Sequence, residues 1–108
     1  MLSDDSPAII TAPDTAVIRR SLEKRLKERE DIIRDLAPRA APNVDPVAWT
    51  TTAASRRVME RIVAALDRLA EGSYGRCIRC GSAIVAERLE VLPYAESCID
   101  CQLHAERA

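Results

Sequence analysis

The sequence contains few aromatic residues and no phenylalanine. Trp49, Tyr74 and Tyr94 are the aromatic residues among 108, so a broad core of aromatic side chains is not expected. No apolar run approaches the roughly 18 residues of a membrane span. The first 13 residues hold no lysine or arginine, and their apolar stretch is too short for a secretion signal. We therefore expect a small cytoplasmic protein of one domain or two sub-domains.

An excess of charge of either sign is also missing. The chain has 16 basic and 17 acidic residues and a formal net charge of −1. A dedicated nucleic-acid-binding domain usually carries a basic excess, so the composition argues against one. The charged residues instead separate the apolar residues of two long periodic segments, which is typical of solvated helix faces.

The first periodic segment predicts a helix over residues 12–37. Residues 1–11 show no period and are expected to form a flexible arm. Pro13 and Asp14 suit a first helical turn, and Pro38 ends the helix. The apolar residues then recur with helical spacing, at Ile18, Leu22, Leu26, Ile33 and Leu36.

The second periodic segment predicts a helix over residues 46–71. Asp45 is a favourable N-cap, Pro46 suits the first helical position, and Gly72 can end the helix in a left-handed conformation. Its stripe consists of Val58, Ile62, Ala65, Leu66 and Leu69. Two helices of similar length with a short connector predict an antiparallel coiled-coil hairpin over residues 12–71, with its tip at about 38–50. Such a hairpin is only marginally stable by itself, so we expect it to pack against the C-terminal region of the chain or against a partner.

Four cysteines occur in the last 32 residues, in two matched pairs. Cys77 and Cys80 are followed, after 17 intervening residues, by Cys98 and Cys101. Two such pairs are typical of a four-thiolate zinc site, and Gly81 allows a tight turn after the first pair. A complete tetrahedral shell leaves no position for substrate, so the sequence predicts one structural Zn²⁺ and no catalytic site. An iron–sulfur cluster is the next alternative; disulfides or a redox-active pair explain the pattern less well.

The remainder of the cysteine-rich region, 72–108, predicts a small module. We expect a short strand over residues 82–85, a turn or extended segment over 88–92 ending at Pro93, and a final helix from Cys98 to about Arg107. His104 is expected on the surface of that helix because four thiolates already complete a metal shell. The apolar material beside the metal is Tyr74, Ile84, Leu89 and Leu92. The fold class is therefore mainly α: a helical hairpin, a four-cysteine zinc module and a short terminal helix.

Beyond the cysteines, several residues resemble the DksA/TraR C4-type zinc-finger family over about 40 positions. The similarity includes the approach Gly72-x-Tyr74-Gly75-x-Cys77, the group Cys80-Gly81-x-x-Ile84, the segment Arg88-Leu89-x-x-x-Pro93, and Glu106. The resemblance implies a bacterial regulator that binds RNA polymerase directly. It further implies insertion of the hairpin into the secondary channel to modulate initiation, in some members together with the alarmone ppGpp.

The predicted tip departs from the family pattern. In DksA-like members the tip carries Asp-x-x-Asp-x-Ala, whereas here Asp45 matches the first acid, Ala48 replaces the second, and Thr50 replaces the alanine. Asp45 can act as a helix cap, as a functional carboxylate, or as both. Trp49 is either a plug over the end of the seam, which we favour, or an exposed anchor for a partner.

A group of basic residues in the second helix is a second candidate contact surface. Arg56, Arg57 and Arg61 lack enough nearby acids to offset them. They form either a solvated face or a contact to an acidic polymerase surface or a phosphate-rich ligand.

Two other functions compete with polymerase binding. Direct DNA binding by the zinc module is disfavoured, because residues 77–108 carry three arginines and five acids. Metal binding disfavours DNA binding further. Four thiolates add four negative charges and zinc adds two positive ones, so the formal net charge changes from −1 to −3. A thiol-sensing helical assembly factor is the other alternative, since thiolate ligands can be oxidised.

Overall fold

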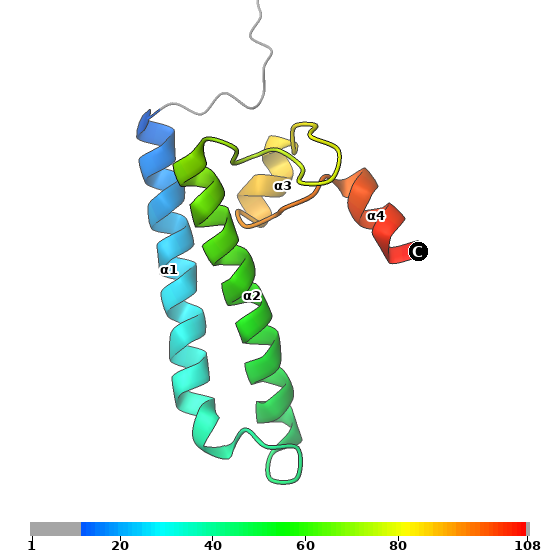
Figure 1. The fold of residues 1–108 in the computed structure, drawn as a ribbon. Helices are drawn as coiled ribbons and strands as arrows, with labels where there is room; N and C mark the ends of the chain where they lie inside the picture. The colour runs from blue at the N-terminus through cyan, green and yellow to red at the C-terminus, as the bar shows by residue number, and fades with distance from the viewer. Residues whose placement is uncertain (1–11, 108) are drawn as a thin grey trace, which may run out of the picture.

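Two long helices, α1 (Ala12–Leu36) and α2 (Pro46–Glu71), run antiparallel and form the predicted hairpin (Figure 1). The computed structural model describes residues 12–107, so the predicted arm at residues 1–11 lies outside the described residues. A small module comes after α2 and packs beside the end of the hairpin opposite the tip (Figure 1). The resulting molecule is elongated, with principal extents of 59 × 35 × 21 Å.

The residues at the helix ends explain where the helices begin and stop. α1 ends at Leu36, one residue before the predicted end, and a 3-10 turn (Ala37–Arg39) follows because Pro38 cannot continue an α-helix. At the start of α2 the Ala48 N–H donates to Asp45 Oδ1 at 3.0 Å, which confirms the predicted cap. At its end Gly72 adopts φ +87°, a left-handed conformation that favours glycine.

The hairpin seam is narrow and its composition changes along its length. Leu22, Ile62 and Ala65 are completely buried at the end near the module, and Leu69 is nearly so. Towards the tip, small residues of α2 are buried instead: Ala48, Thr52 and Ser55. The hydroxyls of Thr52 and Ser55 have no hydrogen-bond partner among the described residues. Burial of bulky side chains is therefore concentrated in the half of the hairpin that carries the module.

The module contains two short helices, α3 (Ala86–Val91) and α4 (Ile99–Arg107), and its middle corrects the sequence prediction. Residues 82–85 form no strand; the pairing there is a single antiparallel bridge between Arg76 and Ala83. The predicted turn or extended segment at residues 88–92 is mostly helical and belongs to α3. Good helix formers before the stop at Pro93 favour the short helix that the structure has here.

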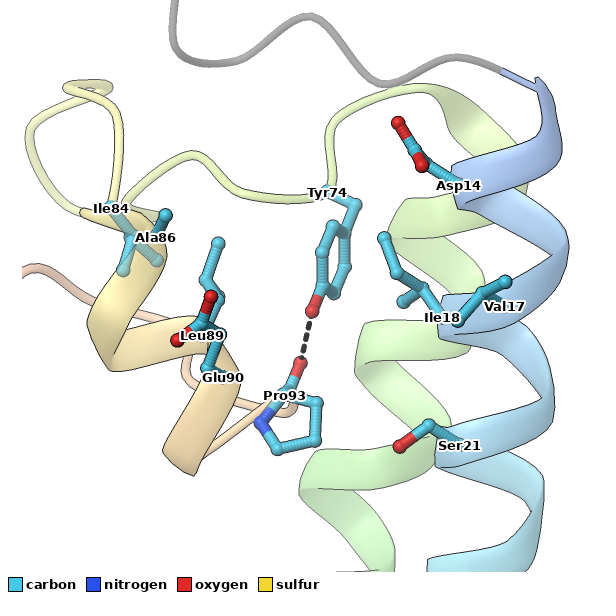
Figure 2. Close-up of a pocket in the computed structure, with 10 residues that line it drawn as sticks. All are labelled: Asp14, Val17, Ile18, Ser21, Tyr74, Ile84, Ala86, Leu89, Glu90 and Pro93. Atoms are coloured by element: carbon cyan, nitrogen blue, oxygen red, sulfur yellow. Dashed lines mark hydrogen bonds between the residues drawn. The ribbon is translucent and has the colours of Figure 1, made fainter.

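The module and the hairpin share one core. Tyr74 is buried in the same cluster as the seam residues, and Leu89 of α3 packs against that cluster. The Tyr74 hydroxyl donates to the Pro93 carbonyl at 2.7 Å, as Figure 2 shows. Two of the apolar residues expected beside the metal, Tyr74 and Leu89, thus join the core of the hairpin and give the hairpin the support that it was expected to need.

Within residues 12–107, none of the helices has an apolar stretch long enough to cross a membrane.

Candidate metal centre

The structure brings the four predicted cysteines together. One sulfur from each of Cys77, Cys80, Cys98 and Cys101 lies within 4.8 Å of the other three. The Sγ atoms of Cys80 and Cys98 are 3.8 Å apart. Four Zn–S bonds of about 2.3 Å in a tetrahedron require sulfur separations of about 3.8 Å, so the arrangement fits Zn²⁺.

Two tight turns place the sulfurs. After Cys77 the Arg79 N–H approaches the Cys77 Sγ at 3.4 Å, and after Cys98 the Cys101 N–H approaches the Cys98 Sγ at 3.4 Å. Gly81, at φ +77°, closes the first turn by donating its N–H to the Cys77 carbonyl at 3.0 Å. The second turn runs directly into α4, so its backbone is fixed by a helix start.

Backbone pairing holds the two turns against each other. The Ile78 N–H donates to the Glu96 carbonyl at 2.9 Å and thereby connects the first turn to the segment before the second. The Arg88 Nε donates to the Ser97 carbonyl at 3.0 Å, which ties that segment to α3. Both ligand pairs are consequently positioned by the module's own backbone.

The electrostatics of the cluster favour a bound cation. Burial acts to raise the pKa of the Cys77 thiol, but N–H groups of Cys80, Cys98 and Arg79 favour the thiolate and lower the pKa to about 6. The neighbouring thiols of Cys98, Cys77 and Cys80 raise the pKa of Cys101 to about 12. The Cys101 thiolate therefore forms readily only beside a positive ion. Four thiolates fill a tetrahedral shell, and the cluster is a structural zinc site with no open position for a substrate.

His104 contributes no ligand atom to the cluster. It lies exposed on α4, as predicted, and all four ligands are cysteines.

Comparison with known proteins agrees with this metal centre. The family model described as the prokaryotic dksA/traR C4-type zinc finger matches residues 72–107, the segment that carries all four ligands. The RNA polymerase-binding transcription factor DksA of Caulobacter vibrioides is 33% identical over 94 residues, which cover 84% of this chain and 66% of that protein. The chain belongs to the DksA/TraR C4-type zinc-finger family.

Other relatives match over shorter stretches. The RNA polymerase-binding transcription factor DksA of Haemophilus influenzae is 43% identical over 51 residues, which cover 47% of this chain and 35% of that protein. General stress protein 16O of Bacillus subtilis is 37% identical over 51 residues, or 31% of its length. The chain thus spans about a third of the length of these two relatives.

Solved structures of the DksA/TraR family share the fold. An RNA polymerase binding protein and transcriptional regulator Dks from Chlamydia trachomatis aligns with a TM-score of 0.68 at 22% identity, covering 92% of this chain and 94% of the other. Transcription factor DksA2 from Pseudomonas aeruginosa aligns with a TM-score of 0.60 at 23% identity. The hairpin and the module therefore occur together in other proteins.

At the hairpin tip, Asp45 is partly exposed and both of its carboxylate oxygens have contacts. Oδ1 accepts from the Ala48 N–H, and Oδ2 accepts from Arg39 Nε at 3.0 Å. The Ala48 N–H and the Arg39 side chain lower the pKa of Asp45 below its ordinary 3.8, and desolvation opposes them. Sequence reasoning missed Arg39, although a basic residue in the connector close to an acidic cap was a signal for it.

The neighbours of Asp45 in α2 differ in exposure. Trp49 is 48% exposed, which corrects the prediction of a plug over the seam. Ala48 is 3% exposed and occupies the buried position instead, so its side chain is covered by the hairpin itself. Successive helical residues point about 100° apart, and the small alanine fits between the helices where the indole would not.

The three arginines of the predicted basic group line neighbouring grooves along α2. Arg57 and Arg61 line one groove together with Glu96 of the module. Arg56 lines two others, one of which shares Glu60 and Ala64 with the first. All three side chains are exposed.

Proposed function

We propose that this chain is a non-enzymatic transcription regulator that binds RNA polymerase and inserts its hairpin tip into the secondary channel to modulate initiation. One observation carries the proposal. A slender helical hairpin projects from the four-cysteine module and presents the Asp45 carboxylate and the exposed Trp49 at its far end. The names of the relatives, RNA polymerase-binding transcription factors, support the choice of partner.

The dimensions of the hairpin support its role as a probe. A helix of 26 residues, such as α2, is about 39 Å long. The module packs beside the half of the hairpin away from the tip, so the tip half is free to enter a channel (Figure 1). The zinc ion and the shared core with Tyr74 fix the module as a rigid base for the hairpin.

We assign three contacts to polymerase. Asp45 places a carboxylate at the tip, and Trp49 offers an apolar surface that a partner pocket can bury. Arg57 and Arg61 lie at the junction of hairpin and module, where they suit an acidic polymerase surface or a phosphate-rich ligand such as ppGpp at the interface.

Transcription initiation with purified polymerase tests this proposal. We expect the zinc-loaded chain to change the yield or lifetime of open complexes, and Trp49→Ala to lose most of this effect while keeping the helical circular dichroism of the wild type. Thr50→Ala is the matched tip control, since it changes a neighbouring exposed residue. Adding ppGpp to the same reactions tests the alarmone assignment, with Arg57→Ala as its variant. No effect of the wild-type chain on initiation would refute the proposal.

Direct DNA binding remains the second candidate to exclude experimentally. A mobility-shift titration without polymerase should show no salt-sensitive binding, because the module is acidic in balance.

A further inference from the structure

A groove lies between the first turns of α1 and the short helix α3 (Figure 2). Figure 2 shows Tyr74 between the two helices, with Ile18 of α1 on one side and Leu89 of α3 on the other. The groove has a volume of about 470 Å³, which is in the range of sites that enclose a small molecule. It is therefore large enough to take several side chains.

Part of the apolar wall of this groove is not covered by residues 12–107. Val17 of α1 lines the groove and is 59% exposed, and Ala86 at the start of α3 is exposed as well. Two carboxylates, Asp14 and Glu90, line the groove, and none of its lining residues is a lysine or an arginine. The groove thus suits an uncharged apolar segment and disfavours an acidic one.

The chain just before α1 contains such a segment. Residues 7–10, which lie outside the described part of the chain, have the uncharged sequence Pro-Ala-Ile-Ile, and the acids Asp4 and Asp5 are further upstream. α1 begins at the edge of the groove, since Asp14 belongs to its first turn and lines the groove. Pro13 lacks the N–H that a helix continued upstream would need, so the sequence favours a change of chain direction at this edge.

We propose that residues 7–10 fold back along α1 and pack into the groove. Ile9 and Ile10 cover Val17 and Leu89, so apolar surface on both sides leaves contact with water. The run is joined to α1 through Thr11 alone, and so short a connection gives an effective concentration in the millimolar range. A weak apolar contact is consequently enough to populate the packed state, which links α1 to α3.

The length of the run matches the length of the groove. Ser21 is the lining residue of α1 furthest from its start, and α1 rises about 14 Å from Ala12 to Ser21. Five residues of extended chain, from Ala12 back to Pro7, span about 17 Å. The run therefore reaches the whole groove, and the acids at positions 4 and 5 remain beyond it.

Methyl NMR of the full-length, zinc-loaded chain tests the proposal. With isoleucine, leucine and valine methyl groups labelled, we expect nuclear Overhauser effects from Ile9 or Ile10 to Val17 and Leu89. A mixture of two differently labelled samples distinguishes the run of the same chain from that of a second copy. The effects should occur within one chain and should not change on dilution.

Two neighbouring substitutions locate the contact. Ala86→Asp places a carboxylate in the groove at the first position of α3, where a helix tolerates an acid. Because this charge has no partner in an apolar contact, the effects should weaken at least about fivefold. Val85→Asp is the matched control and should keep them, since it adds the same charge at an exposed position that does not line the groove.

Three results would overturn the proposal. They are the absence of any effect between residues 7–10 and the groove, effects only between two copies, and effects that Ala86→Asp leaves unchanged. The experiment contains no polymerase, so its outcome is independent of the proposed function.

Discussion

At the scale of single residues, Asp45 combines a structural contact with a candidate functional charge. Its Oδ1 caps α2 and its Oδ2 accepts a hydrogen bond from Arg39, yet the carboxylate stays partly exposed at the tip. Helix capping is by itself a sufficient reason for an aspartate directly before Pro46. The charge explains why the same residue can act on a partner.

Two variants separate the roles of Asp45. Asparagine caps a helix about as well as aspartate but has no charge. Alanine has no charge and cannot cap the helix with its side chain. We expect Asp45→Ala to lower the melting temperature and Asp45→Asn to change it little. Both should lose the tip's effect on polymerase. An Asp45→Asn variant with full activity on polymerase would show that the residue acts only as a cap.

The titration of Asp45 provides an independent check. Its pKa is lowered mainly by the Ala48 N–H and also by Arg39. An acid with a lowered pKa stabilises the fold at pH values above its ordinary pKa, and this contribution is lost as the pH falls through the lower folded-state value. Carbon-detected NMR should therefore find an Asp45 pKa below the ordinary 3.8. An unshifted value would contradict the contacts at the tip.

The Ser55 side chain lowers the stability of the fold. Its hydroxyl is buried in the seam and has no hydrogen-bond partner among the described residues. Ser55→Ala removes the unsatisfied group and improves helix propensity, so we expect the free energy of unfolding to rise by about 1 kcal/mol. Urea denaturation measures this change. A loss of stability would instead show that the hydroxyl has a partner such as an ordered water.

At the scale of elements, the hairpin depends on a short run of bulky residues. Leu22, Ile62 and Ala65 are completely buried, while the tip half of the seam buries small residues. The tip half is thus the part of the hairpin with the least apolar burial, which suits a segment that must present its surface to a partner.

A truncation in the bulky part of the seam should be costly. Ile62→Ala removes a fully buried side chain, and we expect a loss of about 2–5 kcal/mol in the free energy of unfolding. Val17→Ala on α1 is the control because Val17 is exposed, and its effect should stay within about 0.5 kcal/mol. Equal effects of the two substitutions in urea denaturation would contradict the assignment of the core.

The sequence predicted the elements that obey local rules. The Asp45–Pro46 start, the stop at Gly72 and the cysteine spacing are local patterns, and the structure confirms the cap, the left-handed glycine and the sulfur cluster. The segment around Ala86–Val91 was predicted wrongly, because a six-residue helix is too short to show helical periodicity. The burial of Ala48 in place of Trp49 depends on the rotation of α2 against α1, which a single helix does not reveal.

At the scale of the whole molecule, the metal centre and the hairpin are connected through one core. The turns around Cys77 and Cys98 supply the four zinc ligands, and the module that carries them contributes Tyr74 and Leu89 to the cluster that contains Ile62. Metal binding to a module of this size supplies folding free energy. Loss of the metal should therefore destabilise the hairpin as well as the cysteine-bearing turns.

Chelation of zinc tests this coupling. We expect hydrogen exchange to become fast from Tyr74 to Cys101, while α1 and α2 keep slower exchange but melt at a lower temperature. Cys98→Ser should behave like the chelated protein because it removes one ligand. Unchanged exchange around Cys77 after complete zinc removal would contradict a structural role for the metal.

The central claim is that the hairpin tip reaches into RNA polymerase, and site-specific crosslinking tests it most directly. A photoreactive residue in place of Thr50, beside the tip, should crosslink to polymerase segments that line the secondary channel. The same residue in place of Lys24, on the exposed side of α1, should give a weaker or different product. An excess of the unmodified chain should abolish the Thr50 product. Absence of any crosslink from the tip, with the zinc-loaded chain folded and the polymerase active, would contradict the account.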